Sequence, residues 1–412
     1  MTIKFPIKYN PAGLILLVVL LVVQLVWQAS AQAVTVQVSA EFTPSRNNPN
    51  NRTFTNTSNV SGVCSGAHKD LCRSLGVFSI NMRSSVTDSG TKMGDGVRGY
   101  GRGSLYFGLP GPRTITVTSD TGETATVIFR IVGAAFRIHA EDTPMPVSDV
   151  RSYRGCREAF GNAEYQTNIM RIMLADNGGS SQSACAFEML GDGLYSFSAR
   201  DLVYEIETPE PLNMKNGIYR GVSSYSVGGM GHDFDYGDGV NIVDPSLNIE
   251  FALTVNHMFA LEFPPGSDTA VLQPLGGWSQ WTDYKKVPAT LRKDQHFTVS
   301  GSTNFSVNLS CEFPMPDGRC GISNGVSTVP LDVAITMPGF LGRIGMGFME
   351  AVDYPLTASP IDVPRFSPKE GAVFQRRSYL RFEVNDEPIK EMVTHPGTQY
   401  KGRVTVIFDA DM

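Results

Sequence analysis

Gly321-Ile-Ser323-Asn-Gly325 matches the G-x-S-x-G pattern in which serine hydrolases carry their nucleophile. The pattern works where a strand turns sharply into a helix, because that turn exposes the serine hydroxyl. Here the β-prone residues 326–330 follow and end in proline, while Cys320 directly precedes the motif. A turn fixed by a disulfide is the simpler interpretation, and we predict that the chain is not an enzyme.

A second acidic segment, Asp233-Phe-Asp235-Tyr-Gly-Asp238, resembles the start of a calcium loop. An EF-hand needs an oxygen ligand at the fifth position, glycine at the sixth and glutamate at the twelfth. This chain offers Gly237, Asp238 and Asp244 there. We favour a Gly/Asp turn, with a calcium site of another kind as the alternative. With no CxxC pair and six scattered histidines, zinc is not expected either, so we predict no metal and no cofactor.

Two aromatic segments could contact a sugar. Glycines alternate with Arg98, Tyr100 and Arg102 in residues 94–103, which gives either a solvated turn or a loop suited to glycan contact. These three residues are the candidate receptor-binding residues.

Trp278, Trp281 and Tyr284 form the other aromatic segment. They could make a sugar platform, but aromatic residues next to a domain boundary more often pack within the junction, and we favour packing.

The first 33 residues read as a secretory signal peptide. Lys4 and Lys8 precede an apolar run from Leu14 to Trp27, and small-residue cleavage sites end at Ala31 and Ala33. The alternative, a membrane anchor, needs about 20 apolar residues, and this run is shorter. We therefore expect an exported protein.

The charge balance argues against nucleic acid as a partner. The chain has 34 Lys and Arg against 40 Asp and Glu, a formal net charge of −6, and no basic stripe that could neutralise phosphates. Charged residues make up 18%, below the usual quarter, which suits an exported all-β protein.

Six cysteines fall into three local pairs. Several connectivities are possible in principle, but sequence proximity favours the nested ones, and export favours oxidation. The expected disulfides are Cys64–Cys72, Cys156–Cys185 and Cys311–Cys320.

Short alternating segments separated by turn signals predict an all-β fold of sandwich type. Residues 113–118 and 125–132 should form a hairpin around 119–123, and residues 247–255 and 258–263 another around Asn256-His257. Only Arg157 to Leu174 could hold a helix of any length, although Gly161 weakens it.

Phe263-Pro-Pro-Gly-Ser-Asp268 marks a domain boundary, because two prolines and a glycine interrupt the pattern. We expect two immunoglobulin-like β-sandwich domains in tandem, over residues 34–265 and 266–412. The second ends on a strand with Val404, Val406 and Phe408 on one face. Such an apolar edge must pair with its own sheet or with another chain.

Several segments resemble the tip adhesins of class 5 (alternate chaperone–usher) fimbriae, of the colonisation-factor and cable-pilus type. The closing residues 397–408 look like the terminal strand of those subunits, and Phe305 to Cys311 looks like the start of their pilin-domain cysteine pair. Asn216-Gly-Ile-Tyr219, followed by residues 247–263, looks like the end of their adhesin domain.

The resemblance implies an adhesin domain over 34–265 and a pilin domain over 266–412 that lacks its last strand. A groove beside the terminal strand would accept a strand first from a periplasmic chaperone and then from the major pilin. An outer-membrane usher would be the third assembly partner, and a host glycan or glycoprotein the receptor of this tip subunit on the cell surface. The groove residues would be Tyr400, Val404, Val406, Phe408 and Met412.

Two features leave alternatives open. Residues 226–232 replace the paired arginines of the family's late adhesin strand, so that receptor site does not carry over. Val34 to Phe42 is either the first strand of the adhesin domain or a donor strand like that of a polymerising pilin. A tip adhesin and assembly initiator is the favoured function. A minor structural pilin and a secreted glycan hydrolase are the alternatives.

Overall fold

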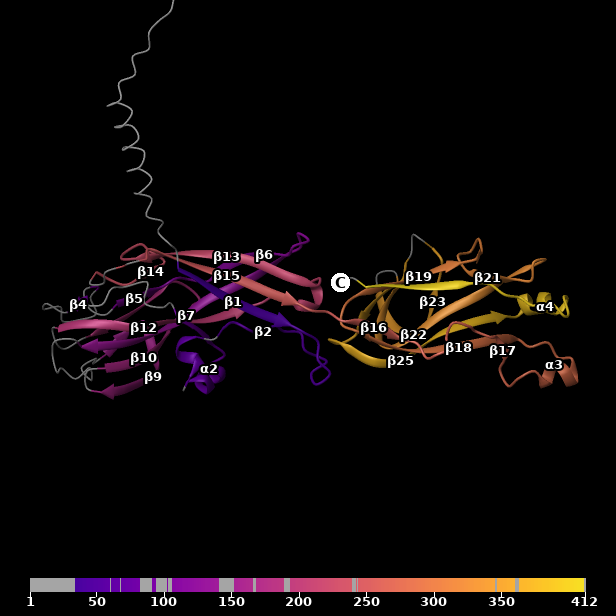
Figure 1. Ribbon diagram of the computed structural model, residues 1–412, viewed down its shortest axis with the longest axis horizontal. Coiled ribbons are helices and arrows are strands. Elements are labelled where there is room, and N and C mark those ends of the chain that lie inside the picture. The colour runs from indigo at the N-terminus through magenta and orange to yellow at the C-terminus, as the bar shows by residue number, and fades with distance from the viewer. Residues whose placement is uncertain are drawn as a thin grey trace, which may run out of the picture.

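A computed structural model describes residues 34–59, 61–66, 68–81, 91–93, 102, 106–140, 152–165, 168–188, 193–238, 242, 244–344, 347–359 and 363–410. These residues are mostly β-strand and form two β-sandwich domains that lie end to end (Figure 1). The all-β prediction is therefore correct. The predicted signal peptide lies outside the described residues.

The first domain is a single large sheet that folds around an apolar core. The path through it runs β3-β12-β7-β6-β13-β14-β5-β11-β8. Its strands are β1 (Val34–Phe42), β2 (Thr55–Asn56), β3 (Phe78–Asn81), β4 (Thr91–Met93), β5 (Tyr106–Leu109), β6 (Arg113–Thr118), β7 (Thr124–Ala140), β8 (Ser152–Arg154), β9 (Cys156–Tyr165), β10 (Asn168–Ala175), β11 (Ser183–Glu188), β12 (Gly193–Glu207), β13 (Gly217–Gly228), β14 (Phe234–Asp235) and β15 (Ser246–Val255). Its helical turns are η1 (Gly62–Ser65), α2 (Lys69–Leu75) and η3 (Pro211–Asn213).

Strand β1 belongs to this first domain. All nine of its residues pair in parallel with β15, from Val34 opposite Leu247 to Phe42 opposite Val255. Val38 and Phe42 on its inner face are almost fully buried, as the alternation in the sequence requires. The question left open by the sequence is thereby answered: Val34–Phe42 is an intradomain strand.

In this domain one local prediction is correct and another is not. The hairpin of β6 and β7 is confirmed, with Arg113 opposite Phe129. The segment that could have held a helix, Arg157 to Leu174, does not hold one, because it forms the antiparallel strands β9 and β10. β10 also pairs with β7 on its other edge, and these tertiary pairings outweigh a weak helical tendency that Gly161 reduces further.

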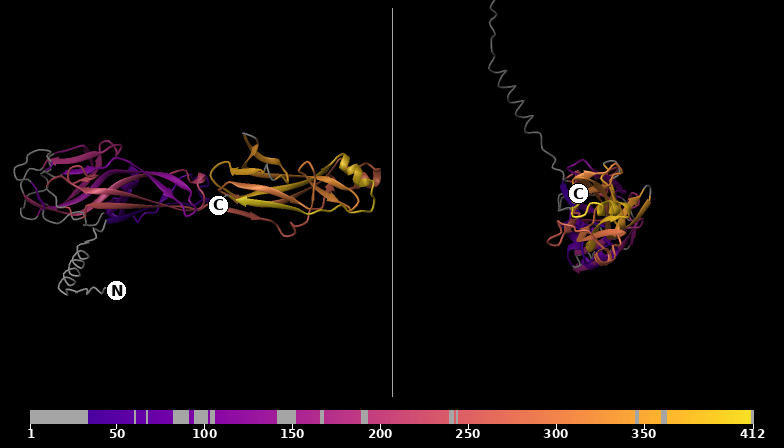
Figure 2. Two further views of the ribbon diagram at one scale, coloured as in Figure 1. Left: turned by 90° about the horizontal axis from the view of Figure 1, so that it is seen from above. Right: turned by 90° about the vertical axis from the view of Figure 1, so that its right-hand side faces the viewer.

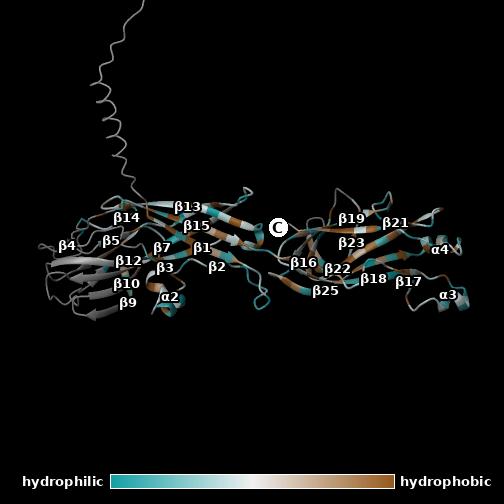
Figure 3. Ribbon diagram, in the orientation of Figure 1, coloured by the Kyte–Doolittle hydropathy of each residue, from teal (hydrophilic) through white to brown (hydrophobic). Residues whose placement is uncertain are grey.

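The second domain is a separate sheet that runs β16-β18-β25-β22-β24-β19-β26. Its strands are β16 (Phe259–Glu262), β17 (Gln273–Pro274), β18 (Thr290–Gly301), β19 (Phe305–Cys311), β20 (Phe313–Pro314), β21 (Cys320–Ser323), β22 (Thr328–Ile344), β23 (Gly347–Leu356), β24 (Arg365–Pro368), β25 (Val373–Asn385) and β26 (Val404–Ala410). Two short helices, α3 (Ser279–Tyr284) and α4 (Glu387–Val393), lie at the end remote from the first domain (Figures 1 and 2). Apolar and polar residues alternate along strands of both domains (Figure 3).

The chain changes sheets at residues 256–258. β15 already has β1 and β13 as neighbours, so β16 pairs with β18 of the second sheet instead. The hairpin predicted around Asn256-His257 is therefore wrong. The boundary predicted between residues 265 and 266 also falls too late, because it leaves β16 in the first domain. A local alternating pattern identifies both strands but does not reveal which sheet each one joins.

The two domains meet around His257, which is only 8% exposed. Its Nε2 lies 2.8 Å from the carbonyl oxygen of Met214 in the first domain, and its Nδ1 lies 3.2 Å from Ser302 Oγ in the second. A second contact joins the domains where Ala372 N–H donates to Pro49 O at 2.6 Å. The junction is thus held at two places.

Candidate functional site: the groove beside the last strand

Strand β26 lies at the end of its sheet and has one strand neighbour among the described residues. All seven of its residues pair with β19, from Val404 opposite Cys311 to Ala410 opposite Phe305. Its other backbone edge therefore presents N–H and C=O groups that no described strand pairs. An exposed strand edge of this length is a template for pairing with another chain.

The inner face of β26 is incompletely covered. Val404, Val406 and Phe408 point toward the core, yet each is only partly buried. Val307 and Leu309 on the neighbouring strand are almost fully buried. Three of the predicted groove residues, Val404, Val406 and Phe408, thus lie on one half-covered face; Val404 and Val406 line the groove described next, whereas Phe408 does not.

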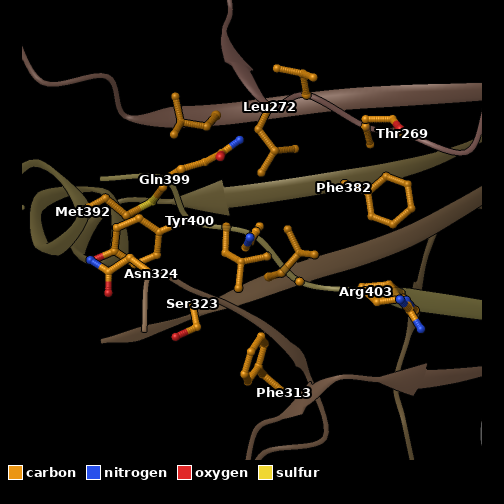
Figure 4. A pocket seen from close by; sticks show the side chains of 18 of the residues that line it. Thr269, Leu272, Phe313, Ser323, Asn324, Phe382, Met392, Gln399, Tyr400 and Arg403 are labelled. Carbon is orange, nitrogen blue, oxygen red and sulfur yellow. The ribbon is translucent and has the colours of Figure 1, made fainter. Parts of the chain in front are cut away.

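A groove of about 1840 Å³ runs beside β26. One wall comes from residues 263–272 and the other from 399–404. In Figure 4, Thr269 and Leu272 lie on one side of the groove and Phe313 on the other. The side chain of Phe382 lies between these two sides. The apolar side chains of the floor come from β18, β22, β25 and α4. They are Leu291, Leu331, Leu380, Phe382, Ile389 and Met392.

The groove lining includes Phe263 and Val406 but does not reach Phe408, whose ring packs in an aromatic cluster beyond that end of the groove. The Phe408 ring centroid lies 5.9 Å from Phe297, 6.3 Å from Phe305 and 6.4 Å from Phe259. Since β16 begins at Phe259, directly after the junction, this end is the one beside the first domain (Figure 1). The groove therefore opens toward α3 and α4.

The segment that leads into β26 is fixed by hydrogen bonds to a hairpin. Tyr400 Oη lies 2.6 Å from Ser327 Oγ, and the backbones of Lys401 and Ser323 exchange hydrogen bonds of 3.0 and 2.9 Å. The disulfide between Cys311 and Cys320 ties the same hairpin to β19. The predicted groove residue Tyr400 therefore has a positioning role at the start of the strand. Met412 lies outside the described residues.

Ser323, the serine of the G-x-S-x-G match, is part of this hairpin. It ends β21, and β22 follows after a turn, so the local geometry is strand–turn–strand. Its Oγ donates to Ser327 O at 2.9 Å and accepts from Gly325 N–H at 3.1 Å, and the residue is 8% exposed. These bonds engage the hydroxyl in the turn, as the simpler interpretation of the sequence expects.

Arg102, one of the predicted receptor-binding residues, is engaged within the first domain. Its guanidinium pairs with Asp235 through both terminal nitrogens and with Asp238 through Nε at 3.0 Å, and 21% of its side chain is exposed. The prediction of a freely presented cation is wrong for this residue, because β14 brings Asp235 against it. Arg98 and Tyr100 lie outside the described residues.

The aspartates of the candidate calcium loop are paired with arginines. Asp233 accepts from Arg113 Nη2 at 2.6 Å and from Ser226 N–H at 2.8 Å. Burial opposes the ionisation of Asp233 and Asp235, but these hydrogen bonds outweigh it and lower the pKa of both. Gly237 has φ +75°, which fits the Gly/Asp turn. Across the described residues, no cluster of His, Cys, Asp and Glu is arranged to hold a metal.

The aromatic segment of α3 does not pack at the domain junction. Trp278 and Tyr284 are 44% and 75% exposed, and α3 lies at the remote end of the second domain (Figure 2). The favoured prediction of junction packing is therefore wrong. Trp278 and Trp281 instead line the open end of the groove.

Two of the three predicted disulfides are present, Cys64–Cys72 and Cys311–Cys320. Cys156 and Cys185 are buried thiols that are not bonded to each other in the structure. The hydrogen bond that ties the Cys185 S–H to the Cys156 sulfur, together with burial, raises the pKa of the Cys185 thiol far above its ordinary value. The third predicted pair is therefore in contact but is not a disulfide in this structure.

The sequence did not point to the wall at residues 263–272. The signal it carries is an apolar stretch, Val271 to Leu275, within a segment rich in glycine and proline. Val271 and Leu275 are 61% and 73% exposed, which is unusual so close to a core. Burial patterns cannot be read from such a segment because it has neither helical nor strand periodicity.

Comparisons with known proteins give little. No protein-family model matches, and no curated protein matches. Two solved structures align over most of the chain. One is a chaperone–tip adhesin complex of CFA/I fimbriae biogenesis, at 11% identity and a TM-score of 0.25, covering 92% of this chain and 97% of that chain. The other is the CsuC–CsuE chaperone–tip adhesion subunit pre-assembly complex from archaic chaperone–usher Csu pili of Acinetobacter baumannii, at 12% identity and a TM-score of 0.22, covering 92% and 98%. These TM-scores are too low to establish a common fold.

Helices in the described part of the chain are short. None of them has both the length and the apolar character needed to span a membrane.

Proposed function

We propose that this chain is a two-domain, non-enzymatic tip adhesin of a chaperone–usher fimbria and an initiator of its assembly. The observation that carries the proposal is the state of β26. Among the described strands it pairs on one edge only, its inner face is half-covered, and an apolar groove lies beside it. This arrangement suits β-strand addition, in which main-chain hydrogen bonds give affinity and alternate side chains fill the groove.

The occupant is an extended segment of another polypeptide with apolar residues at every second position. Such a strand covers Val404 and Val406 and pairs with the free edge of β26. A periplasmic chaperone supplies it first, and the major pilin replaces the chaperone at the outer-membrane usher. The expected signal peptide fits this route through the periplasm.

The first domain would bind a host glycan or glycoprotein. The pairing of β1 with β15 favours a tip position over a place inside the fibre, because Val34–Phe42 is used in its own domain. Withdrawing it to fill a neighbour's groove would remove a nine-residue strand and expose Val38 and Phe42.

Co-expression with the chaperone of the same operon tests the proposal. The mature chain alone should be recovered poorly from the periplasm, because its groove is open and apolar. Together with the chaperone it should give a soluble one-to-one complex by size-exclusion chromatography. A full-length chain that is stable, monomeric and indifferent to the chaperone contradicts the proposal.

A further inference from the structure

The groove has one open end, and that end fixes where the body of an occupant can lie. On the side of the first domain the groove lining ends at Phe263 and Val406, next to the packed rings of Phe259, Phe297 and Phe408. A strand in the groove whose chain continues into a folded domain must therefore leave toward α3 and α4 (Figure 1). If that strand precedes its domain in sequence, it runs antiparallel to β26, which itself starts at the open end.

An apolar surface stands at this exit. Leu275, Trp278 and Tyr284 are 73%, 44% and 75% exposed, and all three fall within ten residues of the sequence. Large apolar side chains grouped on a surface mark interaction sites more often than isolated ones do. We call these three residues the exit patch.

The exit patch is continuous with the groove. Trp278 lines the groove, whereas Leu275 and Tyr284 do not. The segment is held loosely, since β17 pairs with β18 at only two positions, Gln273 and Pro274. A partner that enters the groove at this end therefore meets the exit patch next.

Two lysines extend this surface. Lys285 and Lys286 directly follow α3 and are exposed. No ion pair involves either side chain among the described residues of the chain. A partner surface with carboxylates beside an apolar centre would complement them.

We propose that the exit patch docks the globular body of the next fibre subunit, a pilin domain that presents an apolar surface flanked by acidic residues. This inference rests on the proposed function, because it assumes that the subunit's N-terminal strand fills the groove. The strand and the body then bind as two linked elements, and the body sets the angle at which the fibre leaves the second domain.

The test separates the two contacts. The probes are the major pilin of the same operon, as a whole folded subunit, and a synthetic peptide of its N-terminal strand. The double variant Leu275→Ser/Tyr284→Ser alters side chains outside the groove, and Phe348→Ser is the matched control, since Phe348 is 67% exposed on β23. Binding is measured by competition against the chaperone complex.

We expect the double variant to bind the whole pilin about tenfold or more weakly, and to bind the peptide as the wild type does. Phe348→Ser should leave both affinities unchanged. Unchanged affinity of the double variant for the whole pilin overturns the inference but leaves the proposed function standing. The inference is also overturned if the double variant loses as much affinity for the peptide as for the whole pilin, or if it loses affinity for the chaperone alone. Failure of the wild type to bind either probe contradicts the proposed function itself.

Tryptophan fluorescence gives an independent readout. The three tryptophans are Trp27, which lies in the expected signal peptide, and Trp278 and Trp281 at the groove exit. The tryptophan emission of the mature chain, excited selectively, therefore comes from the exit alone. Whole pilin should shift this emission to shorter wavelength more than the peptide does, and an equal shift by the two probes counts against body docking.

Discussion

Phe408 of the last strand lies 6.4 Å, between ring centroids, from Phe259 at the opposite edge of the same sheet. The two edges of the second domain thus meet beside the junction through side chains, and the described strands show no backbone pairing between them. Farther along β26, residues 263–272 face the strand across an open groove. A domain closed at one end and open at the other is poised to receive one strand.

Replacement of Val406 by aspartate should weaken the complex with the chaperone about a hundredfold or more. Val406 packs against the core of the second domain from the half-covered face, so an occupant strand would bury the new charge without a partner. Ile407→Asp is the control, because Ile407 is on the outer face and is 46% exposed. Pull-down yields from periplasmic extracts measure both. Equal losses for the two variants would mean that the inner face has no special role.

Cys156 and Cys185 should form a disulfide in the exported protein. Both are buried, and their side chains interact with each other in the folded protein. Closing a loop of this length stabilises the fold by about 3 to 4 kcal/mol in the chain-entropy model. Thiol labelling of denatured, unreduced periplasmic protein should find no free cysteine, whereas two labelled thiols per chain would contradict the prediction. Cys156→Ser/Cys185→Ser should lower the unfolding temperature.

The second domain should lose stability in acid through Asp294. Hydrogen bonds from Arg292 and Arg381 at 2.9 and 3.1 Å lower the pKa of this carboxylate. Because the folded pKa is the lower one, the stabilisation is present above the ordinary value and is lost as pH falls below about 4. Asp294→Asn should lower the free energy of unfolding by about 1 to 2 kcal/mol at neutral pH. It should also make that free energy depend less on pH in the acid range. Urea unfolding of the second domain across pH 3 to 7 measures this, and an unchanged dependence on pH in the acid range would refute it.

The sequence predicts individual strands well where one face is buried. The alternation at residues 34–42 and 404–408 places β1 and β26 correctly, since burial of one face imposes period 2. The β6–β7 hairpin is also predictable, because its turn residues are local. These features depend on neighbours within a few residues.

Features that depend on distant partners could not be predicted. Residues 157–174 form strands because β9 pairs with β10 and β10 pairs with β7. Arg102 is held by Asp235, which is 133 residues away in the sequence. The groove itself needs two walls from residues 263–272 and 399–404, which no local pattern connects. The sequence indicated only one of them, the terminal strand.

His257 should make the domain junction sensitive to mild acid. Burial lowers its pKa below the ordinary 6.5, so the folded protein keeps the ring neutral. The Nε2–H then donates to Met214 O, and Nδ1 accepts from Ser302 Oγ. Because the unfolded chain takes up this proton more readily, the stabilisation is complete above about pH 6.5 and declines as pH falls toward the folded pKa.

His257→Gln tests this coupling, since glutamine can keep one of the hydrogen bonds but does not titrate. We expect the wild type to lose rigidity at the junction between about pH 6.5 and 5, seen as a fall in the maximum dimension by small-angle scattering as the domains cease to lie end to end. The variant should give one profile at both pH values. Asp294→Asn, which leaves His257 intact, should keep the wild-type response over this range. A wild-type profile that does not change with pH would show that His257 is a passive part of the junction.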